Sequence, residues 1–94
     1  MQQSADAAET LALTALGWLL EHEELLPVFM GSSGTSAADM RDRAADPDFL
    51  GSVLDFLLMD EAWLVAFCDA RSVPYDHPMQ ARAALPGGAQ FHWT

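Results

Sequence analysis

One apolar stretch occurs twice in this sequence, and the repeat limits what the chain can fold into. Residues 54–67 align position for position with residues 16–29, and Trp18 exchanges with Phe56 between the two copies. The identical pairs are Leu16/Leu54, Leu19/Leu57, Leu20/Leu58, Glu23/Glu61, Leu26/Leu64 and Phe29/Phe67. Such self-similarity is typical of one supersecondary unit used twice.

The repeat also sets the predicted domain organisation. We expect one domain over residues 1–94, with two similar three-helix units at about 6–45 and 46–86 and a tail at 87–94. Hydrophobic residues make up 51% of the chain, which is enough for a core in spite of the net charge of −10.

Apolar residues recur at helical spacing through most of the chain, so the predicted fold class is all-α. About six short helices are expected, near residues 6–21, 25–30, 38–44, 48–59, 62–69 and 79–85. The helix near 48–59 is apolar on nearly every side except Ser52 and Asp55. A helix of that kind needs neighbours around most of its circumference, so we place it at the centre of the fold.

Polar residues mark the expected helix ends. Asp6, with Glu9 three positions later, has the spacing of a capping box, and Ser36 or Thr35 is expected to cap the third helix. Asp46 precedes a proline, which is typical of a helix start. The glycine- and serine-rich segment 31–34 is interpreted as a loop.

Gly17 lies inside the first predicted helix, where glycine costs about 1 kcal/mol relative to alanine. Close approach of another helix would explain it. The second copy carries Asp55 at the corresponding position, so a close helix approach is not required there.

The charge balance excludes several kinds of partner. Fourteen acidic residues accompany four arginines, with no lysine. Such a surface repels nucleic-acid phosphates and anionic membranes, so neither is an expected partner. One cysteine cannot form an intrachain disulfide, and the sequence shows neither a signal peptide nor a transmembrane span. We therefore expect a cytoplasmic protein.

The acidic and thiol side chains do not predict an active site. Residues 21–24 are adjacent positions that diverge around a helix, so they are interpreted as a solvated helix junction and not as a metal site. Glu23 and Glu61 could in principle form an acid pair, but first-turn capping explains their correspondence better. Cys68 has Asp69 beside it and is interpreted as a buried structural thiol. We expect no catalytic residue, no cofactor and no metal.

The remaining polar candidates also have a structural explanation. Arg43 and Arg82 correspond between the two copies and could bind an anion. A salt bridge to an acid, or contact with helix-end carbonyls, is the favoured alternative. His77 lies between Asp76 and Pro78 and is interpreted as a loop residue.

Aromatic residues are the candidate interaction site: Trp18, Trp63, Phe91 and Trp93. Phe91 and Trp93 follow a Pro-Gly-Gly break and could form a strap over the helices or an exposed anchor for a partner. A deep pocket lined by Trp18, Phe56 and Trp63 would indicate an apolar ligand. A flat exposed patch of the same residues would indicate a protein partner.

Several motifs resemble a bacterial family known as domain of unknown function 3572. They are Glu9-Thr10-Leu11-Ala12-Leu13, Phe56-Leu57-Leu58 with Glu61, Leu85-Pro86-Gly87-Gly88 and His92-Trp93-Thr94. The resemblance covers nearly the whole chain and implies an all-helical cytoplasmic protein. It supplies no activity, cofactor or catalytic residue.

The leading functional hypothesis is a small acidic protein-interaction or adaptor module, with an unknown protein or a second copy of the chain as partner. The alternative is a bundle that binds an apolar small molecule, or an accessory protein of an enzyme. A stand-alone enzyme ranks third, because the sequence contains no nucleophile–base pair or metal constellation.

Overall fold

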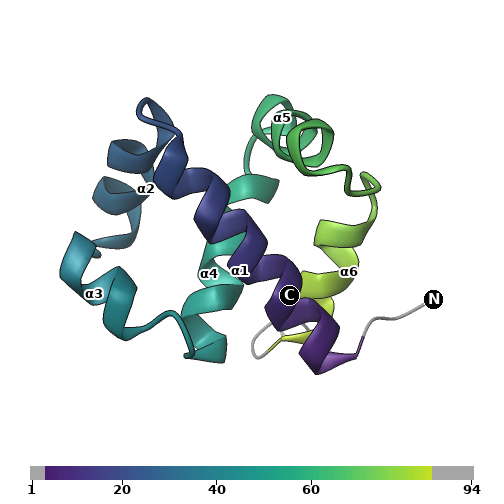
Figure 1. The fold of residues 1–94 in the computed structure, drawn as a ribbon, viewed down its shortest axis with the longest axis horizontal. Helices are drawn as coiled ribbons and strands as arrows, with labels where there is room; N and C mark the ends of the chain where they lie inside the picture. The colour runs from purple at the N-terminus through teal and green to yellow at the C-terminus, as the bar shows by residue number, and fades with distance from the viewer. Residues whose placement is uncertain (1–3, 86–94) are drawn as a thin grey trace, which may run out of the picture.

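The computed structural model describes residues 4–85, and all of its regular structure there is helical. The helices are α1 (Ala5–Glu21), α2 (Leu25–Ser33), α3 (Ala37–Asp42), α4 (Pro47–Leu58), α5 (Glu61–Arg71) and α6 (His77–Ala84). Figure 1 shows α1 crossing the front of the molecule, with α2 and α3 on one side and α5 and α6 on the other. The predicted all-α fold of six short helices is confirmed.

Most of the predicted caps are present. Ser36 accepts a hydrogen bond from the Asp39 amide, and Asp39 accepts one from the Ser36 amide, which completes a capping box at α3. Asp46 caps α4. The cap predicted at Asp6 was wrong, because Ser4 has the extended backbone of a cap and accepts from the Ala7 amide.

Helix α2 is longer than predicted. It continues through residues 31–33 and ends at Gly34, whose φ of 70° lies in the left-handed region. A glycine adopts that conformation without steric cost, so the helix can end there and need not end at Gly31. The loop predicted at 31–34 was therefore wrong for its first three residues. Pro27 lies in the first turn of α2, where the N–H that proline lacks would have no partner within the helix.

Helix α6 begins earlier than predicted, at His77. Pro78 occupies its first turn, where the fixed φ of proline suits a helix start. The interpretation of His77 as a loop residue was wrong for this reason.

Helix α4 lies at the centre, as predicted. It packs against α1, α2, α5 and α6. Its buried residues are Phe49, Leu50, Gly51, Val53, Leu54, Phe56 and Leu57. α1 covers it with a face of small residues and leucines, and Phe29 and Phe67 bring α2 and α5 onto the same core.

One ion pair joins the central helix to α6. Arg82 Nε donates to Asp55 Oδ1 at 2.6 Å, and the Arg82 side chain is largely buried. The guanidinium passes over Gly51, where an added Cβ would lie 2.9 Å from Arg82 Nη1. Glycine at this place lets the guanidinium lie against the α4 backbone. Of the alternatives for Arg82, the salt bridge is present.

Two equivalent three-helix units are not confirmed. α1 packs on α2, and α4 packs on α5. The third helices differ, because α6 packs extensively on both α1 and α4, whereas α3 makes no comparable contact with any described helix. α3 reaches the core mainly through buried Met40.

Leu57→Ala is expected to lower the free energy of unfolding by about 2–5 kcal/mol, because Leu57 is fully buried on the central helix. Urea denaturation measures the change. Met59→Ala is the control, since Met59 is 71% exposed and should change stability by less than about 0.5 kcal/mol. A loss under 1 kcal/mol for Leu57→Ala would mean that α4 is peripheral.

Gly51→Ala tests the contact with Arg82. Alanine favours a helix by about 1 kcal/mol over glycine. In an Arg82→Ala background the substitution should therefore stabilise the protein. In the wild-type background the added Cβ displaces the guanidinium, so we expect most of that gain to be lost. A double-mutant cycle by chemical denaturation measures the difference, and equal effects in both backgrounds would contradict the contact.

Candidate functional site

The outer side of α1 carries two exposed leucines among polar residues such as Glu9 and Thr10. Ala8, Ala12, Ala15 and Leu19 are fully buried on the inner side. Leu13 and Leu20 lie on the outer side and are 45% and 51% exposed. In Figure 1, α1 runs across the front of the molecule with no other helix in front of it. Exposed leucines two turns apart on one helix form a larger patch than scattered surface residues do.

Gly17 belongs to the same outer side. A Cβ built on Gly17 would meet nothing within 4 Å among the described residues. The close approach of another helix that would explain this glycine is therefore not made within residues 4–85. No contact among the described residues offsets the conformational cost of a glycine at this helix position.

A groove separates α1 from α3. It encloses about 310 Å³ and is lined by Leu16, Leu20, Met40, Arg41 and Ala44. We call this groove, together with Leu13 and Gly17, the α1–α3 face. Four of the groove's five lining side chains are apolar, and Arg41 adds one charge at its wall. A mostly apolar concavity with one polar group is typical of a recognition site.

Arg41 differs from the other arginines. Arg43 pairs with Asp46, Arg71 with Glu21 and Arg82 with Asp55. Arg41 is exposed and makes no ion pair with any residue between 4 and 85. In a chain with fourteen acids, this leaves one guanidinium available at the wall of an apolar groove. Arginine is a frequent anchor in protein interfaces because it combines charge with a flat apolar surface.

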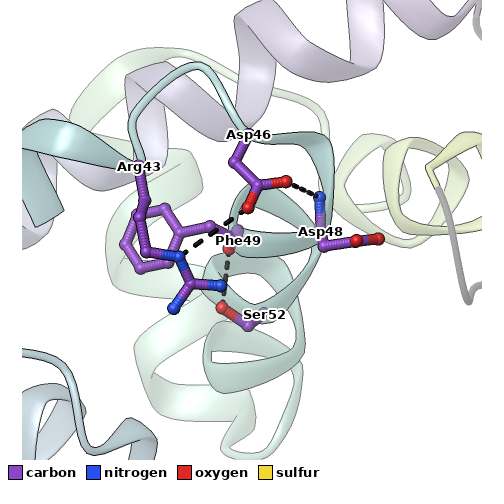
Figure 2. Close-up of polar contacts among 5 residues, drawn as sticks. All are labelled: Arg43, Asp46, Asp48, Phe49 and Ser52. Atoms are coloured by element: carbon purple, nitrogen blue, oxygen red, sulfur yellow. Dashed lines mark hydrogen bonds and ion pairs between the residues drawn. The ribbon is translucent and has the colours of Figure 1, made fainter. Parts of the chain in front are cut away.

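Arg43 is not available in the same way. Its guanidinium lies 5.1 Å from the centre of the Phe49 ring, and its Nε lies 3.7 Å from Asp46 Oδ2. Figure 2 shows that Asp46 also accepts from the Asp48 amide, so one carboxylate caps α4 and holds Arg43. Ser52 donates to the Phe49 carbonyl at 2.6 Å. The salt-bridge alternative is confirmed for Arg43.

The two described tryptophans of the predicted interaction site, Trp18 and Trp63, lie in different surroundings. Trp18 is only 7% exposed and packs against His22 and Phe67, so it belongs to the core and not to an interaction surface. Trp63 is half-buried and stacks on Phe56 at 4.6 Å. Each of these tryptophans packs against another ring. Phe91 and Trp93, the other two candidates, lie outside the described residues.

Sequence reasoning missed the α1–α3 face because it assigned Leu13 and Leu20 to the core periodicity. The signal that could have found them is the width of the apolar arc on α1. Leu13 and Leu20 lie more than a quarter turn from the centre of the buried side at about 100° per residue. A helix that is buried on one side only has a narrower apolar face than α1 has.

The acidic cluster at 21–24 does not gather around one point. Within residues 4–85, no group of three His, Cys, Asp or Glu side chains is placed to hold a metal ion. His22 caps the end of α1 and packs on Trp18. Glu61 lies in the first turn of α5, as expected. Glu23 precedes α2, which begins at Leu25, so its predicted place inside a helix start was wrong.

Cys68 is a buried thiol. Its Sγ lies 3.8 Å from the Pro74 carbonyl oxygen. Burial, with a smaller contribution from the Asp69 charge, raises the pKa of Cys68 above the ordinary value of a thiol. A raised pKa keeps the sulfur protonated near neutral pH, and a protonated thiol is a poor nucleophile.

Cys68 should therefore react slowly with iodoacetamide at pH 8, at least about tenfold more slowly in the native protein than in urea. Mass spectrometry gives the rate directly, because this is the one cysteine of the chain. Equal native and unfolded rates would contradict the burial of the thiol.

Comparison with known proteins identifies a family and no activity. None of the described helices has the length and hydropathy needed to cross a membrane. No curated protein and no solved structure matches the chain. The model of the family described as "Protein of unknown function (DUF3572)" matches residues 5–88, which include all six helices. The chain therefore belongs to the DUF3572 family.

Proposed function

We propose that this protein is a non-enzymatic interaction module of the cytoplasm, and that the α1–α3 face is its docking surface. The observation that carries the proposal is the pair of exposed leucines, Leu13 and Leu20, beside an apolar groove. The groove also holds Arg41, which has no ion pair among residues 4–85. The lone cysteine, which cannot form an intrachain disulfide, supports a reducing compartment.

The energetics favour a protein segment as the occupant of the face. Full burial of one leucine contributes about 1.5–3 kcal/mol, so covering the exposed halves of Leu13 and Leu20 contributes about half of that each. Arg41 would add a charge-assisted hydrogen bond to a carboxylate, which also fixes the register. Such a surface combines a modest apolar gain with one polar anchor, as transient interfaces do.

The alternative is binding of an apolar small molecule. A second groove of about 530 Å³ lies between α1 and the connection from α5 to α6, with Leu11, Val73 and Pro74 in its wall. Its volume falls within the range of small-molecule sites. It ranks second because large exposed apolar side chains are found on the α1–α3 face.

Photo-crosslinking tests the docking surface. A photoreactive amino acid at Leu20 should give discrete protein adducts in the native cell, and the same residue at Met79 should give few. Met79 is the matched control because it is 66% exposed and lies on α6, away from the face. Leu13→Asp should remove the adducts from the Leu20 position, since a charge on the face opposes burial of apolar surface. Adducts of equal yield at both positions would contradict the proposal.

A further inference from the structure

We infer that the groove between α1 and the connection from α5 to α6 binds a small monocarboxylate with an aliphatic body. The Arg71 guanidinium holds the carboxylate, and Leu11 and Val73 contact the aliphatic body. This groove shares no residue with the α1–α3 face. The inference therefore goes beyond the proposed function, and either can fail without the other.

One side of α1 forms a wall of the groove. Ala7, Thr10, Leu11 and Thr14 line it, and because they are spaced three or four positions apart they lie on one side of the helix. The groove encloses about 530 Å³, which is within the range of small-molecule sites. From Ala7 to Thr14 it follows about 10 Å of the helix axis, the length of an extended chain of about eight carbons.

The groove carries positive charge on an otherwise acidic protein. Arg71 lines it, whereas none of the fourteen acidic residues does, and the structure describes all fourteen. Glu21, the ion-pair partner of Arg71, lines a separate hollow beside Trp18, and its side chain is 73% exposed. The groove is therefore a place where an anion meets a cation at short range and no lining carboxylate.

Most of the hydrogen-bonding capacity of Arg71 is unused within residues 4–85. A guanidinium has five N–H donors. The Arg71 side chain makes one hydrogen bond in this part of the chain, from Nη2 to Glu21 Oε1 at 3.0 Å. Its Nε is buried and has no partner there. A partly buried guanidinium gains from a further acceptor, and a carboxylate fits its planar arrangement of donors.

The groove has a charged end and an apolar end. Because Arg71 bonds to Glu21, about two turns beyond Thr14 on α1, it lies toward the Thr14 end. Leu11 lies about one turn and Ala7 about two turns from Thr14 toward the start of α1. A ligand with one charged end and an aliphatic body matches this order. A second charge on the ligand would face the apolar wall at a cost.

Ser72 adds a hydroxyl beside Arg71 in the wall of the groove. Its φ of 57° lies in the left-handed region, where glycine would have no steric cost. The serine supplies a donor that a glycine lacks. The carbonyls at the end of α5 oppose an anion here, whereas the first turn of α6, which begins at His77 in the same groove, favours one. These two effects oppose each other, so Arg71 is the deciding charge.

Titration of the full chain with octanoate, followed by backbone amide chemical shifts, tests the site. Octanoate should shift the amides of residues 7–14 and 71–77. Octanamide is the matched neutral probe, and it should bind at least about tenfold more weakly because it forms no charge-assisted hydrogen bond. Arg71→Gln should remove the preference for octanoate and leave the affinity for octanamide unchanged. Arg43→Gln changes the net charge equally and should alter neither affinity, since Arg43 lies outside the groove.

Two further variants separate binding from folding. Leu11→Ala should weaken both probes alike, because it removes apolar wall and leaves the guanidinium in place. Ser72→Gly should raise the melting temperature by a few degrees, since it relieves the left-handed serine, yet weaken octanoate by about threefold. A serine with a purely structural role would not give that combination.

The inference is overturned if octanoate shifts none of the groove amides up to about 5 mM. Equal affinity for octanoate and octanamide, or a preference that survives Arg71→Gln, also overturns it. Shifts confined to the amides around Leu13 and Leu20 would place octanoate on the α1–α3 face, which rejects the groove and not the proposed function. Photo-crosslinking at Leu20 should be the same in Arg71→Gln as in the wild type, because the two surfaces share no residue.

Discussion

Helix α4 can be stable in water only when other helices enclose it, and the rest of the fold meets this requirement. Seven of its twelve residues are buried, from Phe49 to Leu57. α1, α2, α5 and α6 each cover part of its circumference. The hydrophobic contribution of this burial is the main favourable term for a domain of this size. The other helices are amphipathic or short, and α1 and α6 also pack extensively on each other.

Asp55, the charged side chain beyond the first turn of α4, is satisfied in a specific way. Asp55 accepts from Arg82 of α6, and Gly51 leaves room for the guanidinium. A partly buried carboxylate without such a partner would oppose the packing of α6. The arrangement therefore fixes α6 against α4 and α1. Among residues 4–85, no equivalent ion pair joins α3 to a helix beneath it, and α3 is held by buried Met40 and by Arg43 over Phe49.

This difference between α3 and α6 leaves the α1–α3 face open. In the second half of the chain the third helix packs closely on α1 and α4, whereas in the first half a groove remains between α3 and α1. The repeated sequence thus supplies similar helices in two unlike settings. A module in which one half is closed by its own helix and the other is available for a partner is consistent with the proposed interaction role.

The sequence by itself determined the helices and the centre of the fold. Caps at Ser36 and Asp46 act within a few residues, and the apolar circumference of residues 48–59 is a local property. The burial of Cys68 was predictable for the same reason. Only the tertiary structure decided that Trp18 is in the core, that Leu13 and Leu20 are outside it, and that Arg82 pairs with Asp55. Each of these depends on which helices meet in space, and periodicity along one helix does not specify its neighbours.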